Sequence, residues 1–118
     1  MQIISIEPLP ASKKRKRITL DTRESFVLYT GEIRKHSELK EGAFLSEADY
    51  QEILTKILLP RAKKRTLHLL EKQDRTRADV IMKLTQGGYP SEIAEAAADY
   101  AASYGYIDDR RYASNFIY

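Results

Sequence analysis

The residues whose type and spacing most suggest chemistry are two adjacent carboxylates, Asp108 and Asp109, near the end of the 118-residue chain. A pair of carboxylates could hold a metal ion or divide the roles of general acid and base. Adjacent residues on a helix, however, point in different directions. A carboxylate at a helix start accepts hydrogen bonds from free backbone N–H groups and suits the positive end of the helix dipole. We therefore interpret both aspartates as helix caps.

Other signals of catalysis are missing from the sequence. His36 and His68 lie in different predicted elements, and neither has a histidine or carboxylate at the spacing of metal ligands. The chain has no cysteine, which excludes disulfides and thiolate metal sites. It also contains no glycine-rich phosphate loop and no nucleophile elbow. We expect a binding protein that is not an enzyme and needs no metal or cofactor.

A run of five cations near the N-terminus invites a nucleic-acid or phosphate interpretation. Such a run would bind polyanions in a salt-dependent way and without sequence specificity. The alternative is a solvated loop or an edge strand, whose charges discourage association between sheets. The sequence leaves both interpretations open. The run consists of Lys13, Lys14, Arg15, Lys16 and Arg17.

The eight tyrosines could in principle form a platform for stacking bases. Tyr100, Tyr104 and Tyr112, however, keep helical spacing with other apolar residues. This spacing favours a place in the helical core.

The elements that must position these residues change character along the chain. Residues 1–45 read as short strands, with a run from Ile3 that ends at Pro8 and Pro10, and a hairpin that pairs residues 18–20 with 26–29. Thr30-Gly31-Glu32 is a turn signal, after which Ile33 could begin a further strand. The sequence predicts a three- or four-stranded antiparallel sheet.

From Ser46 onwards the periodicity is helical. Ser46 with Asp49 resembles a capping box, and Pro60 stops or restarts the helix, with a new one over 60–73. Thr76, with Asp79 reaching back, begins a short helix that ends at Gly87-Gly88, and a longer one begins near Pro90.

Gly105 then closes that longer helix in a conformation of positive φ. Asp108 begins another, and Tyr106-Ile107 between them is predicted to be held in a core. The last helix has an apolar stripe but no C-cap, so we expect the chain to be part of a longer protein. The stripe consists of Tyr112, Ala113, Phe116 and Ile117.

The whole reads as an α+β protein: a small β-rich region over 1–45 and a helical region over 46–118, whose first three-helix repeat covers about 60–118. The net charge is +3, and it is unevenly distributed. Residues 61–83 are mostly basic, whereas residues 92–109 carry only acidic charges. One surface should be positive and another negative, which suits a composite partner such as a protein on nucleic acid. No signal peptide or membrane span is apparent, so the cytoplasm is expected.

The order of motifs in the second half of the chain resembles the RecX family of bacterial recombinase regulators. Asp79 stands where that family more often has glutamate, which preserves the cap. The resemblance rests on Leu67, Leu70, Arg75, Thr76, Arg77, Ala78, Asp79, Lys83, Leu84, Gly88, Tyr89, Ile93, Gly105, Tyr106, Ile107, Asp108, Asp109, Tyr112 and Ala113.

The resemblance implies a monomer built from three-helix repeats that binds the RecA nucleoprotein filament on single-stranded DNA. It would limit filament growth, ATP hydrolysis and strand exchange, and so modulate recombination, DNA repair and the SOS response. A helix-turn-helix DNA-binding protein over Thr76–Tyr104 and a structural adaptor remain alternatives. Besides the five N-terminal cations, the residues hypothesised to contact DNA phosphate or acidic recombinase surface are Arg61, Lys63, Lys64, Arg65, Arg75, Arg77 and Lys83.

Overall fold

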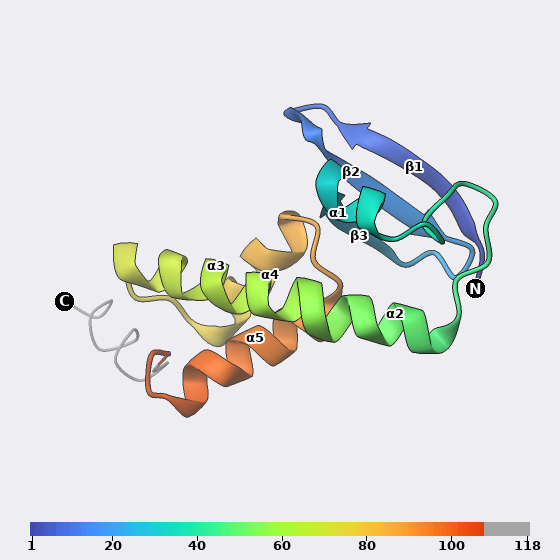
Figure 1. Ribbon diagram of the computed structural model, residues 1–118. Helices are drawn as coiled ribbons and strands as arrows, with labels where there is room; N and C mark the ends of the chain where they lie inside the picture. The colour runs from blue at the N-terminus through green and yellow to red at the C-terminus, as the bar shows by residue number, and fades with distance from the viewer. Residues whose placement is uncertain (108–118) are drawn as a thin grey trace. The chain divides into compact units, whose positions relative to one another are not determined.

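The computed structural model describes residues 1–107; the remaining positions, 108–118, lie outside the described part. The chain divides into two compact units, Met1–Ile53 and a second unit that begins at Leu54. Figure 1 shows that strands dominate the first unit and helices the second. The α+β class predicted from the sequence is thereby confirmed.

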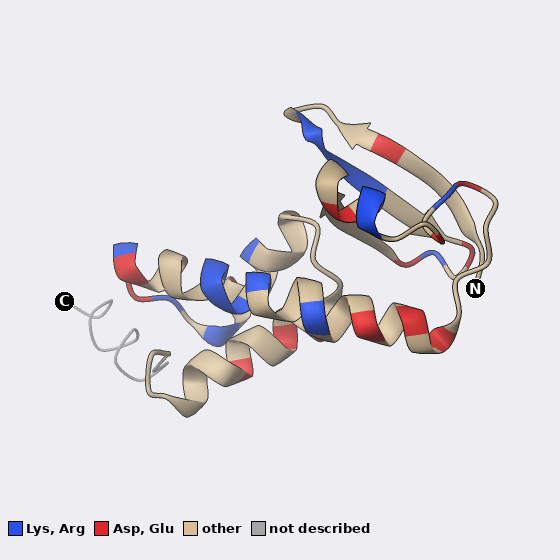
Figure 2. Cartoon of the chain, viewed as in Figure 1, with Lys and Arg blue, Asp and Glu red and all other residues tan. Residues whose placement is uncertain are grey.

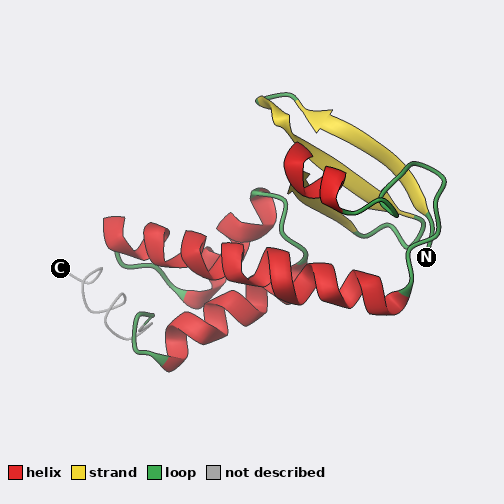
Figure 3. Cartoon of the chain, viewed as in Figure 1, coloured by secondary structure: helices red, strands yellow, loops and turns green. Residues whose placement is uncertain are grey.

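The first unit is built on a three-stranded antiparallel sheet in the order β1-β2-β3. Strand β1 spans Ile3–Leu9, β2 spans Ser12–Leu20 and β3 spans Ser25–Tyr29 (Figure 3). One face of the sheet carries a fully buried apolar layer, as the alternation of a half-buried antiparallel sheet requires. The layer contains Ile3, Ile18, Leu20, Phe26 and Leu28.

Two predictions for this unit were wrong in detail. Pro8 lies inside β1 and does not end it, which is possible because β1 is an edge strand, where a missing N–H breaks no ladder. Ile33 belongs to helix α1 (Thr30–Lys35) and not to a fourth strand. The Glu32 carboxylate accepts the backbone N–H of Tyr29 at 2.8 Å. The residues predicted as a turn therefore form the capped first turn of a helix.

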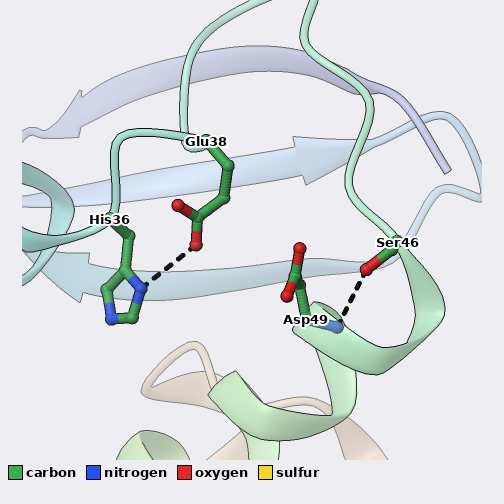
Figure 4. A network of polar contacts seen from close by, with 4 residues as sticks. All are labelled: His36, Glu38, Ser46 and Asp49. Carbon is green, nitrogen blue, oxygen red and sulfur yellow. Dashed lines mark hydrogen bonds and ion pairs between the residues drawn. The ribbon is translucent and has the colours of Figure 1, made fainter.

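Helix α2 (Glu47–Ile53) completes the first unit. The Ser46 hydroxyl accepts the backbone N–H of Asp49 at 3.1 Å, which confirms the predicted cap (Figure 4). Tyr50 is buried, with its ring 6.0 Å from that of Phe26 and its hydroxyl bonded to the Glu24 carboxylate. Tyr50 of α2 therefore packs against Phe26 of the apolar layer.

The second unit begins with a π-helical segment, η1 (Leu54–Leu58), followed directly by α3 (Leu59–Lys72). Pro60 lies in the first turn of α3, directly after the π-helical segment. Its ring would clash with the carbonyl four residues earlier in an uninterrupted α-helix. The wider π turn lies at that point, so Pro60 accompanies a change of helix type rather than a stop.

Helices α4 (Arg77–Gln86) and α5 (Ser91–Ser103) pack with α3 around a common core. Thr66 is fully buried and its hydroxyl donates to the Ala62 carbonyl at 2.8 Å, which satisfies it. The periodicity of residues 60–73 predicted Leu67 and Leu70 to face inward, but both are half-buried and Leu69 is buried instead. The core contains Ala62, Thr66, Leu69, Val80, Leu84, Ile93, Ala94, Ala97, Ala98 and Ala101.

At the end of α5 the predicted glycine cap is confirmed, whereas two of the tyrosines predicted to be buried are exposed. Gly105 has φ +75°, and the Tyr106 N–H donates to the Ala101 carbonyl at 3.0 Å, as in a Schellman motif. Ile107 is buried, but Tyr106 and Tyr104 are 47% and 63% exposed. Tyr104 is the C-cap residue, where the chain leaves the helical path and helical spacing no longer predicts burial. Tyr112 and the other residues of the predicted last helix lie outside the described range.

Candidate nucleic-acid interface

Helix α3 presents the clearest cationic surface of the second unit (Figure 2). Lys64, His68 and Lys72 recur at i, i+4 and i+8, which places them on one side of the helix, with Arg65 beside them. All four are exposed, and Glu71 is the one acidic side chain exposed on this helix. We call Lys64, Arg65, His68 and Lys72 the basic face of α3. The hypothesised set did not include Lys72 or His68, although their spacing could have shown both.

Two other cations of α3 lie closer to the core. Arg61 and Lys63 are half-buried. The Lys63 ammonium sits 4.4 Å from the centre of the Tyr100 ring on α5, a distance at which the ring face attracts a cation. Lys63 therefore helps to join α3 to α5.

The arginines at the start of α4 contact carboxylates of their own unit. Arg75 Nη1 donates to Asp79 at 2.6 Å, and its side chain is only 15% exposed. Its Nε is buried without a hydrogen-bond partner among the described residues. Arg77 Nε donates to Asp99 of α5 at 2.7 Å. The Arg75 pair is local to the start of α4, whereas the Arg77 pair joins α4 to α5. The i,i+4 spacing of Arg75 and Asp79 was a signal for the first pair.

Lys83 completes the hypothesised set in this unit. It is exposed on α4, and neither it, Lys64 nor Arg65 forms an ion pair with any part of the chain that the structure describes. These three cations are therefore the most accessible to an external anion.

Helix α5 presents the opposite charge. Glu92, Glu95 and Asp99 are exposed, and the helix has no lysine or arginine. Figure 2 shows these red positions on α5 against the blue positions of α3. The second unit therefore carries both signs of charge on neighbouring helices.

In the first unit the run of five cations lies in β2, the central strand. The alternative interpretation as a loop or edge strand was therefore wrong, because β1 and β3 pair with both sides of β2. Arg15 and Arg17 lie opposite Tyr29 and Val27 in the register, on the face away from the buried layer. Arg17 Nη1 is 3.2 Å from Ser25 Oγ. Lys13 and Lys14 are exposed at the start of the strand, and Lys16 is half-buried.

The motif residues act as structural caps. The Thr76 hydroxyl accepts the Asp79 N–H at 3.1 Å, which confirms the predicted start of α4. The Asp79 carboxylate, predicted to reach back to the cap, instead accepts a hydrogen bond from Arg75 Nη1. Gly88 has φ +99° where α4 ends. Asp108 and Asp109 lie outside the described residues, so the interpretation as caps stays a prediction.

Side chains for metal chemistry do not gather in the described range. His36 Nδ1 lies 3.1 Å from Glu38 Oε1 (Figure 4), but residues 1–107 hold no group of three or more histidines and carboxylates able to bind a metal ion. Within residues 1–107, no helix is both long enough and apolar enough to cross a membrane.

The fold is that of an α+β protein in which a three-helix domain follows a small antiparallel sheet. The family model of the first three-helix domain of RecX matches residues 62–100. Regulatory protein RecX of Clostridium acetobutylicum is 30% identical over 115 residues, which cover 98% of this chain and 53% of the relative. The protein of the same name from Clostridium tetani is 29% identical over 121 residues, with the same coverage. The chain is thus similar to RecX proteins over almost its whole length, and to their first three-helix domain over residues 62–100.

A solved structure shows the same similarity. The crystal structure of a regulatory protein RecX is similar with a TM-score of 0.52 and 28% identity. The similarity covers 98% of this chain and 56% of the solved chain. The β-rich unit, which matched only loosely by sequence motifs, is thus included in the likeness.

Proposed function

We propose that this chain regulates the RecA recombinase by binding the RecA filament on single-stranded DNA. In this role it limits filament growth, ATP hydrolysis and strand exchange. Its similarity to regulatory proteins named RecX carries the proposal. The chain spans about half the length of the curated relatives it matches, so the activity of the longer proteins comes to it as part of this proposal.

The charges of the second unit support contacts of two kinds. The basic face of α3, with Lys83 of α4, suits DNA phosphate or an acidic surface of the recombinase. The acidic residues of α5 suit a basic protein surface and would repel bare DNA. A nucleoprotein filament offers both, whereas free nucleic acid offers only one. Both signs of charge therefore favour a coated strand over a bare one.

A helix-turn-helix function is less well supported. Helices α4 and α5 are joined by a short turn containing Gly88, as in that motif. The second helix, α5, would then enter the major groove, but its exposed charges are all acidic. Phosphate would repel this helix.

Binding to three partners tests the proposal: bare duplex, bare single strand, and single strand coated with RecA. We expect the highest affinity for the coated strand. Strong sequence-specific binding to duplex would favour the helix-turn-helix alternative, and no binding to any partner would favour the adaptor. In the same preparation, addition of the chain to a preformed filament should slow ATP hydrolysis and strand exchange. Unchanged rates at saturating chain would contradict the proposal.

A further inference from the structure

Three tyrosines at the end of α5 form an exposed aromatic group. The rings of Tyr104 and Tyr106 are stacked, with centroids 5.9 Å apart and planes 18° apart. Tyr100 meets Tyr104 edge-on at 5.1 Å. Tyr104 is 63% exposed and Tyr106 is 47% exposed, so large parts of two nearly parallel rings face solvent. The burial of apolar area does not explain this arrangement.

The cap of α5 produces the parallel rings. Gly105, at φ +75°, turns the chain between the two tyrosines, a conformation that a residue with a Cβ adopts only at a cost. The Tyr106 N–H bond to the Ala101 carbonyl fixes the turn. The two rings are therefore positioned by backbone geometry before any ligand arrives, which lowers the cost of ordering them on binding.

Positive charge lies beside the aromatic group. The Lys63 ammonium of α3 is 4.4 Å from the centre of the Tyr100 ring, so one cation lies next to the aromatic group. Proteins that bind single strands combine these two features: cations follow the backbone, and aromatic rings stack with bases. Duplex DNA does not fit, because its bases are already stacked on each other.

We propose that Tyr104 and Tyr106 form a stacking site for unpaired bases of single-stranded DNA, with Lys63 binding an adjoining phosphate. This inference rests on the proposed function, since a filament assembled on single-stranded DNA supplies such bases. It gives the chain a contact with DNA bases in addition to contacts with phosphate. No particular base is favoured, because every base has a ring face.

The test compares two oligonucleotides of equal length, one of thymidine and one abasic, by fluorescence anisotropy. The wild-type chain should bind the thymidine strand more tightly. Tyr104→Ala should weaken that binding by about tenfold and leave the abasic affinity unchanged. Tyr104→Phe and Tyr104→Trp, which keep an aromatic ring, should retain the preference. The matched control is Phe44→Ala, since Phe44 is a 72% exposed aromatic residue of the first unit.

A spectroscopic signal provides a second readout. The chain has no tryptophan, so tyrosine emission can be observed directly. The thymidine strand should quench it, and the abasic strand should not. Equal affinity for both strands, no binding to either, or equal weakening of both by Tyr104→Ala would overturn the stacking site. A Tyr104→Ala variant that loses only thermal stability would also overturn it and assign these rings to packing.

The same preparation separates this inference from the proposed function. If the chain slows ATP hydrolysis by the filament but binds both oligonucleotides equally, filament regulation stands and the stacking site is wrong. If it prefers the thymidine strand but leaves hydrolysis unchanged, the stacking site stands and filament regulation is wrong.

Discussion

At the scale of single residues, Thr76 caps the start of α4 and Gly105 follows the end of α5. The Thr76 hydroxyl satisfies a backbone N–H that the first turn of α4 would otherwise leave without a partner. Thr76→Ala should therefore lower the free energy of unfolding by about 1 kcal/mol, measured by urea denaturation followed through the helical circular dichroism signal. Thr76→Ser keeps the acceptor and should restore most of this loss.

The control for this prediction is Thr85→Ala. Thr85 is exposed and its hydroxyl donates to the Met82 carbonyl, but it caps no helix start. An equal loss in both variants would show that the cap at Thr76 has no special role.

Gly105 provides a second prediction at this scale. No atom lies within 4 Å of a Cβ added there, so the cost of Gly105→Ala comes from the backbone alone. At φ +75° this cost should be about 1 kcal/mol of unfolding free energy. Gly87→Ala is the matched control, because Gly87 has φ −78° and its Cβ would make only ordinary contacts. Equal stability of the two variants in chemical denaturation would refute the backbone argument.

At the scale of elements, the basic face of α3 should determine how strongly binding depends on salt. If Lys64 and Arg65 each contact a phosphate of single-stranded DNA, the double variant Lys64→Ala, Arg65→Ala should reduce the slope of log affinity against log salt by about 1.4. The measurement is a salt titration of binding to a labelled single strand. Charge removal elsewhere should leave the slope almost unchanged.

Arg34 and Lys35 supply the control for that prediction. They are also adjacent exposed cations, in the last turn of α1, and they belong to neither proposed contact set. A similar fall in slope for Arg34→Ala with Lys35→Ala would mean that net charge, and not the face of α3, governs binding.

Element starts and ends were largely predictable because their causes are local. Ser46, Thr76 and Gly105 act through hydrogen bonds or dihedral angles within a few residues of themselves, and each was assigned correctly. The central position of β2 was not predictable, because it depends on pairing with two other strands. The burial of Tyr104 was misassigned since helical spacing was extended past the last turn.

The candidate site was predictable only as a group of charges. The sequence identifies the cations of α3 but does not separate Lys63, which meets an aromatic ring of α5, from Lys64, which is exposed. It likewise does not show that Arg77 meets Asp99, since these residues are far apart in the chain and are brought together by packing. Which cations remain accessible is decided by tertiary structure.

At the scale of the whole molecule, the two signs of charge should separate filament binding from DNA binding. Glu92→Gln with Glu95→Gln should weaken binding to the RecA-coated strand, because it removes charge that complements a basic protein surface. Binding to the bare strand should be equal or tighter, since repulsion of phosphate falls. Surface-immobilised bare and coated strands provide the measurement.

Glu7→Gln with Asp21→Asn removes the same amount of charge from exposed positions of the first unit and serves as control. If it weakens filament binding as much, or if the α5 variant weakens binding to both strands alike, the assignment of α5 to the recombinase is wrong.

The buried alanines of α5 make this helix sensitive to one direction of mutation. Ala94, Ala97, Ala98 and Ala101 have no exposed surface, so they have almost no side-chain volume to lose. Enlarging any of them, even to valine, forces neighbouring side chains or backbone to shift. The apolar layer of the sheet, with Phe26 and Leu28, is instead vulnerable to truncation. In a saturation mutagenesis screen for folded protein, the buried positions of α5 should therefore not tolerate larger side chains. The buried positions of the sheet should not tolerate smaller ones.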